Sequence, residues 1–222
     1  MADAGAERSA EGARNARDAR DAVLGRIREA LADRPLGSPI PRDYERALPP
    51  ETDIAELFVE RVSDYRARVH RTTADGLAAT IGAVLAAHHA TRLATPVGVP
   101  GSWLAASQVE QIPDEPPLSH RDLDRLNGVI TGCAVAIAET GTIVLDAGPD
   151  QGRRAISLLP DLHVCVVMAD QVVGCVPEAL ARLDPARPQT WISGPSATSD
   201  IELQRVEGVH GPRRLDVVLV EG

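Results

Sequence analysis

The sequence predicts an α/β protein with a largely parallel sheet, helices on both faces of that sheet and a helical extension at the N-terminus. From about residue 71, short apolar runs alternate with helical patterns, which is typical of βαβ units. The run 162–168 has no polar face, so we expect it at the centre of the sheet. Hydrophobic residues make up 44% of the 222 residues and aromatic residues only 2%, so the core must be packed from aliphatic side chains.

The N-terminal third is expected to contain three parts. Residues 1–50 should form a flexible tail, a helix and a proline-rich linker, because residues 1–15 hold too few large apolar side chains to offset the entropy lost on ordering. Residues 51–70 carry an apolar stripe at steps of three and four, which predicts an amphipathic helix of about four turns. The stripe should pack on the chain's own sheet, and a homo-oligomer contact is the alternative.

Residues 71–222 are expected to form one α/β domain around a hairpin. The hairpin should bend at Glu139, between apolar runs that end at Ile137 and begin again at Thr142. The periodicity predicts helices at 76–90, 102–108, 153–159, 177–183 and 201–206, a loop at 113–120, and strands at 93–99, 162–168, 190–193 and 215–220, the last closing the sheet.

Charge and motif content exclude several functions. The net charge of −9, without a basic stripe, argues against nucleic-acid binding. The three cysteines lack metal-ligand spacing, so we expect neither a disulfide framework nor a zinc or iron–sulfur cluster in this chain. No apolar run is long enough to span a membrane, which predicts a cytoplasmic protein. No GxGxxG, P-loop or GxSxG motif occurs.

Glu139 is the first candidate for a catalytic residue. It follows one apolar run, and Thr140 and Gly141, which we also predict to contact an anionic ligand, supply the turn to the next. We expect the carboxylate to be buried at the strand end, where it must be hydrogen-bonded, paired or used in chemistry, because desolvating it alone is costly. Alternatively, it accepts hydrogen bonds within the turn and only shapes the bend.

The segment 193–200 is the second candidate, because it lies between a predicted strand and a predicted helix. Ser199 and Glu202 have the spacing of a capping box. Helix starts bind anions through free N–H groups, and ligands of open α/β sheets gather at the carboxyl ends of the strands. We therefore predict a phosphate or carboxylate site there, and its candidate residues are Ser193, Gly194, Ser196, Thr198 and Asp200. The alternative is that these side chains only cap the helix.

Two other groups could contact the same ligand. His210 sits in a Gly/Pro-rich turn and could serve as acid, base, ligand or structural hydrogen-bonding group. Arg153 and Arg154 follow a glycine loop, where a guanidinium could bind a carboxylate or phosphate, or form a surface ion pair. The remaining histidines considered are expected to be structural or exposed: His163 in the central strand, and His88 and His89 in solvent near a helix end.

Four ordered segments resemble the LUD domain of the lactate utilization protein C family. They read ITGCAVAIAETGTIVL at 130–145, RAISLLPDLH at 154–163, ISGPSATSDIE at 192–202 and GVHGP at 208–212. For residues 71–222 the resemblance implies a fold like that of ribose-5-phosphate isomerases, glucosamine-6-phosphate deaminases and CoA transferases. It also implies a role in oxidising L-lactate to pyruvate with two iron–sulfur partner proteins, which would hold the clusters.

Residues Glu139 to Gly141 are also similar to the Glu-x-Gly of CoA transferases, whose glutamate forms a thioester with CoA. Ala138 and Thr140 differ from the Ser and Asn of that pattern, and the glycine-rich oxyanion-hole loop has no counterpart. Three hypotheses follow. The chain is a subunit of a lactate-oxidising assembly that binds an anion, with Glu139 as anchor or proton acceptor; a free-standing CoA-transferase- or sugar-phosphate-isomerase-like enzyme that uses Glu139; or a non-catalytic scaffold module.

Overall fold

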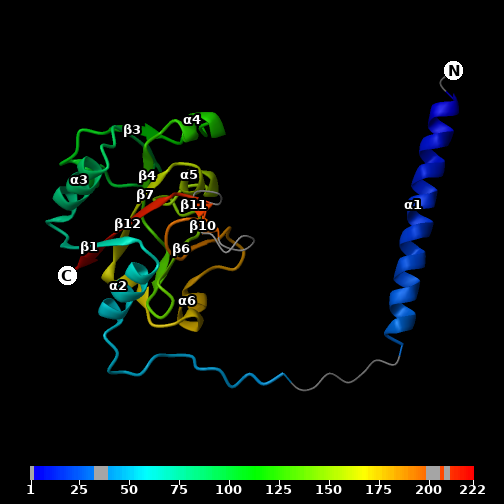
Figure 1. Cartoon of the computed structure of the whole chain (residues 1–222), viewed down its shortest axis with the longest axis horizontal. Helices are drawn as coiled ribbons and strands as arrows, with labels where there is room; N and C mark the ends of the chain where they lie inside the picture. The colour runs from blue at the N-terminus through cyan, green and yellow to red at the C-terminus, as the bar shows by residue number, and fades with distance from the viewer. Residues whose placement is uncertain (1–2, 33–39, 199–205, 208–210) are drawn as a thin grey trace. The chain divides into compact units, whose positions relative to one another are not determined.

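The computed structural model describes residues 3–32, 40–198, 206–207 and 211–222, in two compact units, 1–44 and 45–222. The first unit contains helix α1 (Asp3–Ala30) (Figure 1). Residues 3–15, for which a flexible tail was predicted, belong to this helix. The segment is rich in alanine and arginine, which have high helix propensity, so the backbone preference of these residues favours a helix.

The second unit contains a six-stranded sheet in which every pairing is parallel. Its strands, in spatial order, are β1 (Arg68–Thr73), β12 (Arg214–Glu221), β7 (Leu162–Met168), β4 (Gly128–Thr131), β2 (Arg92–Thr95) and β3 (Glu110–Pro113). The central position predicted for β7 is confirmed. β12 does not close the sheet, because β1 pairs with its outer side.

A second sheet of four strands packs against the first. Its order is β8 (Val172–Val173), β5 (Val135–Ile137), β6 (Thr142–Leu145) and β9 (Thr190–Ile192). The predicted hairpin is confirmed, since β5 and β6 are antiparallel with Ile137 opposite Thr142. A short antiparallel pair joins β10 (Ala197–Thr198) to β11 (Val206–Glu207). The helix predicted at 201–206 is wrong at Val206, which lies in a strand, and residues 199–205 lie outside the described part of the chain.

The helices of the second unit are short and cover both sheets. They are α2 (Ile54–Asp64), α3 (Leu77–Ala87), α4 (His120–Asp124), α5 (Arg154–Leu158) and α6 (Val176–Arg182), with single 3₁₀ turns at Gly101–Leu104 and Ala169–Gln171. The helix predicted over 51–70 ends early, at Asp64. Arg66 has a φ of 68°, a left-handed conformation that stops a helix, and Val69 then belongs to β1.

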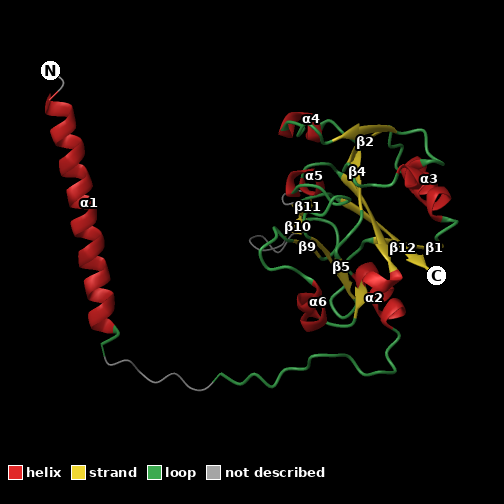
Figure 2. Ribbon diagram, turned by 180° about the vertical axis from the view of Figure 1, so that it is seen from behind, coloured by secondary structure: helices red, strands yellow, loops and turns green. Residues whose placement is uncertain are grey.

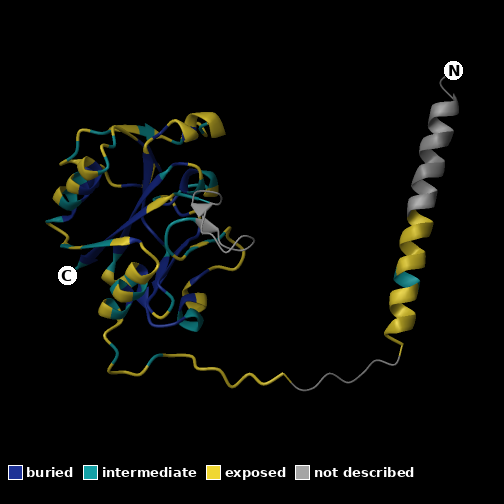
Figure 3. Ribbon diagram, in the orientation of Figure 1, coloured by how far each residue is buried: buried dark blue, intermediate teal, exposed yellow. Residues whose placement is uncertain are grey.

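Side chains that alternate along β7 separate the core into two layers. Val164 and Val166 pack with the apolar face of α3, whereas Cys165 and Val167 point to the second sheet and α2. α6 covers the outer face of the second sheet, and α4 and α5 cover the far end of the first. Figures 2 and 3 show these helices around central strands that are buried, whereas the edge strands β1 and β3 are largely exposed or half-buried. The α/β fold with helices on both faces is therefore confirmed.

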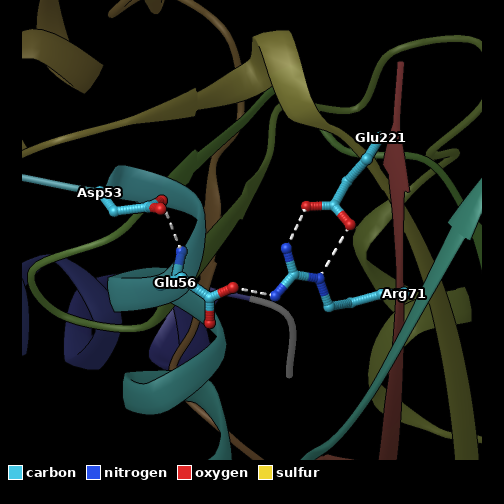
Figure 4. Close-up of polar contacts among 4 residues, drawn as sticks. All are labelled: Asp53, Glu56, Arg71 and Glu221. Carbon is cyan, nitrogen blue, oxygen red and sulfur yellow. Dashed lines mark hydrogen bonds and ion pairs between the residues drawn. The ribbon is translucent and has the colours of Figure 1, made fainter.

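Helix α2 is fixed to the six-stranded sheet on both of its sides. Phe58 and Val62 are buried against the core, which confirms that the apolar stripe packs on the chain's own sheet. The helix begins at an N-cap, where the Asp53 carboxylate accepts a hydrogen bond from the Glu56 amide at 3.1 Å. On the exposed side, Arg71 of β1 donates to Glu56 and, at 2.6 and 2.8 Å, to both carboxylate oxygens of Glu221 (Figure 4).

Candidate functional site

A pocket of about 330 Å³ lies between α5, β9 and the starts of β7 and β12. We call it the Arg154 pocket. The described residues that line it are Arg154, Ser157, Leu158, His163, Gln189, Thr190, Trp191, Ile192, Ser193, Gly194, Pro195, Ser196, Gly211, Pro212 and Leu215. The structure therefore brings Arg154 together with three candidates from a segment that is distant in sequence, namely Ser193, Gly194 and Ser196.

The pocket lies at the amino ends of the central strands. His163 and Leu215 are the second residues of β7 and β12. The expectation that these residues gather at the carboxyl edge of the sheet is wrong. The reason is topological: β9 belongs to the second sheet and ends beside the amino ends of the first, so the segment after β9 starts from that edge.

The Arg154 pocket is positively charged although the chain as a whole is acidic. None of its described lining residues is Asp or Glu, while the chain has 32 acidic residues and a net charge of −9. Arg154 is exposed and forms no ion pair with a described residue. Its neighbour Arg153 instead donates to both oxygens of Asp114, at 2.6 and 2.9 Å. Of the two arginines, Arg154 is thus the one available to an anion.

Hydroxyl groups connect the pocket to the hairpin. The Ser193 side chain lies 2.8 Å from the Thr142 hydroxyl, which lies 2.8 Å from the Thr140 hydroxyl. Gly194 adopts a φ of 81°, and a Cβ there would lie 2.7 Å from the Tyr65 carbonyl oxygen. Ser196 is held by its backbone, whose N–H donates to the Pro212 carbonyl at 2.8 Å.

His163 lines the pocket and also belongs to a series of buried polar side chains that includes Thr131 and Cys165. Its Nε2 lies 2.8 Å from the Thr131 hydroxyl, which in turn donates to the Cys165 sulfur at 3.8 Å. The hydrogen bond from Cys133 has the largest effect on Cys165 and lowers the pKa of that thiol, while the same bond raises the pKa of Cys133. Nδ1 of His163 is the one buried side-chain N or O atom, among the described residues, without a hydrogen-bond partner.

Glu139 occupies a different place. It is exposed, not buried as predicted, and it borders a second pocket together with Arg61, Asp64, Tyr65 and Thr140, which we call the Glu139 pocket. The hairpin turn extends past the end of β5 and packs on the last turn of α2. Gly141, which belongs to the hairpin turn, has a φ of 57°. The desolvation argument for a catalytic role therefore does not apply to this carboxylate.

The other candidates separate into three groups. Asp200 and His210 lie outside the described residues, and only the backbone of Thr198, in β10, is described. His89 is exposed as predicted. The prediction for His88 is wrong, because its side chain is 6% exposed and its Nε2 lies 2.7 Å from the Asp216 carboxylate, whose other oxygen lies 2.7 Å from His70 Nε2.

Trp191 and Gln189 line the pocket but were not predicted as site residues. Trp191 belongs to the predicted strand 190–193, Gln189 directly precedes that strand, and Trp191 is one of only two tryptophans in the chain. A tryptophan on a short strand next to a predicted anion site was the available signal.

Comparison with known proteins identifies the family. The LUD domain model matches residues 54–220, which is most of the chain and includes the whole Arg154 pocket. The chain belongs to the LUD domain family. It is 48% identical over 203 residues to the Lactate utilization protein C of Deinococcus radiodurans, covering 90% of both chains, and 35% identical over 105 residues to that of Bacillus subtilis, covering 44% and 43%.

A solved LUD domain relative confirms the fold. The crystal structure of a DUF162 family protein from Deinococcus radiodurans matches with a TM-score of 0.65 and 45% identity, over 76% of this chain and 97% of that one. Among the described residues of this LUD domain protein, no helix combines the length and the apolar character that crossing a membrane requires.

Proposed function

We propose that this LUD domain protein acts in L-lactate utilization, as the C component of an assembly that oxidises lactate to pyruvate, and that its Arg154 pocket binds an anionic small molecule. In this proposal the iron–sulfur clusters belong to partner proteins. The similarity to Lactate utilization protein C over 90% of both chains supports the role. The observation that carries the ligand class is an exposed arginine, without an ion-pair partner among the described residues, in a pocket lined by no described acidic residue.

Several pocket residues can each donate hydrogen bonds to a bound anion. Arg154 can donate two parallel hydrogen bonds to one carboxylate or phosphate, which fixes the orientation of that group. Ser193 can add a third donor when Thr142 donates to the Ser193 oxygen, because the single Ser193 O–H is then left for the ligand. The neighbouring Gly194 lets the backbone approach α2, so Ser193 is placed on a closely packed segment rather than on a free loop.

The test is a reconstitution of lactate oxidation from purified components. We expect the iron–sulfur partners to need this chain for full turnover, and Arg154→Gln to reduce the rate while leaving assembly of the complex unchanged. Arg92→Gln is the matched control, because Arg92 is an exposed arginine that pairs with Glu110 on the outer strands β2 and β3 and does not line the pocket. Full turnover by the partners without this chain would refute the proposed role.

A second candidate is a free-standing enzyme that resembles CoA transferases or sugar-phosphate isomerases and uses Glu139. One observation favours it: the exposed Glu139 borders a pocket with Arg61 and Tyr65, so a substrate could reach it. Replacing Glu139 by Gln should then abolish turnover of an acyl-CoA or a phosphorylated sugar while the fold is kept, and unchanged turnover would remove this candidate.

A further inference from the structure

We propose that the Arg154 pocket takes a ring-bearing acid, meaning a planar aromatic or heteroaromatic body with one acidic group, which is larger than lactate itself. The acidic group rests on the proposed function above. The ring is the new element, and it is inferred from the size of the pocket, the apolar part of its lining and the presence of Trp191 in that lining.

The pocket is too large for a three-carbon acid alone. Its volume of about 330 Å³ falls within the range of roughly 300–1,000 Å³ that is typical of sites for drug-sized molecules. Lactate, with three carbon atoms, is much smaller than a drug-sized molecule and would fill only part of this volume. A ligand of that size bound to Arg154 would leave most of the pocket to water.

The rest of the lining is apolar and suits a hydrophobic body. Besides the polar groups already described, the pocket is bordered by Leu158, Trp191, Ile192, Pro195, Pro212 and Leu215. The methyl group of lactate can cover only a small part of this surface. Because binding gains about 25 cal/mol for each Å² of apolar surface removed from water, a ligand with a larger apolar body would bind more tightly.

Trp191 is the residue of the pocket lining that would stack on the ring of a ligand. It lies on β9, the edge strand of the second sheet, and is 39% exposed, whereas the other tryptophan, Trp103, is only 9% exposed in the core. The indole N–H donates to the Gln189 side chain at 3.1 Å, so its one polar group is already satisfied and its orientation is restrained. Trp191 is among the residues that line the pocket, and an indole ring prefers offset or edge-to-face contact with another ring.

The charge of the lining selects an acid over a neutral or basic ring. Arg154 supplies a cation, and the described lining offers no carboxylate that would attract a basic ligand. A ligand with both features can therefore bind at two points, with its acid on Arg154 and its ring on Trp191. An aliphatic acyl acid would satisfy the first contact but not the stacking preference of the second.

Calorimetric titration of the full chain with four matched probes tests the proposal. L-lactate and L-3-phenyllactate share the 2-hydroxy acid and differ by the phenyl ring, 3-cyclohexyllactate replaces the flat ring by a saturated one, and 2-phenylethanol has the ring without the acid. We expect phenyllactate to bind about 10-fold or more tightly than lactate, with cyclohexyllactate in between and 2-phenylethanol weaker than phenyllactate. In a Trp103→Phe chain, where Trp191 is the sole tryptophan, phenyllactate should also change the fluorescence.

Two variants assign the contacts. Trp191→Leu should remove most of the advantage of phenyllactate over lactate and of phenyllactate over cyclohexyllactate. Arg154→Gln should weaken both acids by a similar factor and leave their ratio unchanged. Leu180→Ala is the control, since Leu180 is an exposed apolar residue on α6 outside the pocket lining, and it should change neither affinity.

The outcomes separate this inference from the proposed function. Equal affinity for lactate and phenyllactate, or a preference that survives Trp191→Leu, overturns the ring and leaves the anion pocket intact. If neither acid binds, both the anion pocket and this inference are wrong. A loss of lactate oxidation in the Arg154→Gln assembly, together with equal probe affinities, would support the function and refute the ring.

Discussion

The Arg154 pocket and the Glu139 pocket lie on the two sides of the same hairpin region, and they differ in how their charged residue is placed. Arg154 is surrounded by hydroxyls, an amide and apolar side chains, with no described acidic neighbour in the lining. Glu139 shares its pocket with a cation, Arg61, an anion, Asp64, and a tyrosine. The first arrangement leaves a net charge for a ligand to neutralise, whereas the second already contains both signs.

This difference shows that a sequence motif and the best-formed site need not coincide. Glu139 lies in the most distinctive run of the chain, yet its surroundings are those of a tight turn seated on a helix end. Arg154 lies in a less distinctive segment, yet α5 places it among residues from three other segments of the chain.

The largest effect on stability is expected at Gly141, where the Glu139 turn packs closely against the backbone of α2. Its φ is 57°, and a Cβ would lie 2.7 Å from the Arg61 carbonyl carbon. Both the left-handed conformation and the backbone contact oppose a side chain, so Gly141→Ala should lower the free energy of unfolding by about 2–4 kcal/mol. Urea unfolding measures this. Gly101→Ala is the control, because a Cβ there meets nothing within 4 Å. An equal loss of stability in both variants would contradict the close packing of the Glu139 turn on α2.

Next in size is Asp216, which follows the pocket residue Leu215 along β12 but binds His70 and His88 and does not itself line either pocket. Burial alone would raise the pKa of Asp216, but hydrogen bonds with His70 and His88 outweigh burial and leave the pKa below its usual value. Asp216→Asn removes the buried charge from both contacts and should cost about 2 kcal/mol at pH 7.

The sign of the pH dependence follows from the lowered pKa. The unfolded chain takes up a proton on Asp216 near pH 4, before the folded chain does, so acid favours unfolding. The stability contributed by Asp216 is therefore complete above about pH 4 and is lost as the pH falls through the lower folded pKa. Unfolding midpoints of the wild type and Asp216→Asn should converge in acid. A constant difference between them down to pH 2 would contradict this assignment.

The third prediction compares the two charged residues directly. Arg154→Gln should weaken the binding of an acidic ligand by about 10- to 100-fold, because a charge-assisted hydrogen bond is replaced by a weaker neutral one. Glu139→Gln should leave that affinity within about twofold, since Glu139 does not line the Arg154 pocket. Calorimetry with one acidic probe measures both. A larger loss in Glu139→Gln than in Arg154→Gln would reverse the ranking of the two sites.

The fold was largely predictable because periodicity reports local burial. The fully apolar run of β7 and the hairpin around Glu139 follow from short-range patterns, and both were confirmed. β1 was missed because its residues, RVHRTT, are polar enough for an edge strand and continue the helical spacing of α2. Nothing in the local sequence announces the left-handed residue Arg66 that separates the two elements.

The site was predictable only in part, because pockets depend on which segments meet. The candidates Arg154, Ser193 and Ser196 do meet, but at the amino ends of the strands, since β9 belongs to a second sheet that local patterns do not reveal. The burial of His88 has the same kind of cause. Its partner Asp216 is 128 residues away, and only the pairing of β12 with β1 and β7 brings that carboxylate beneath α3.

The smallest predicted effect concerns Thr142, whose hydroxyl lies between the two pockets. It lies 2.8 Å from both the Ser193 and the Thr140 hydroxyl, and the residue is only 5% exposed. Thr142→Val keeps the shape but removes both hydrogen bonds, so we expect a loss of about 1 kcal/mol in stability and about a threefold weaker affinity for an acidic ligand, because Ser193 loses its restraint. Thr142→Ser keeps the hydroxyl and should restore the affinity. If Thr142→Val weakened binding as strongly as Arg154→Gln, the linked hydroxyls of Thr140, Thr142 and Ser193 would couple the two pockets. The Glu139 turn would then be part of the ligand site.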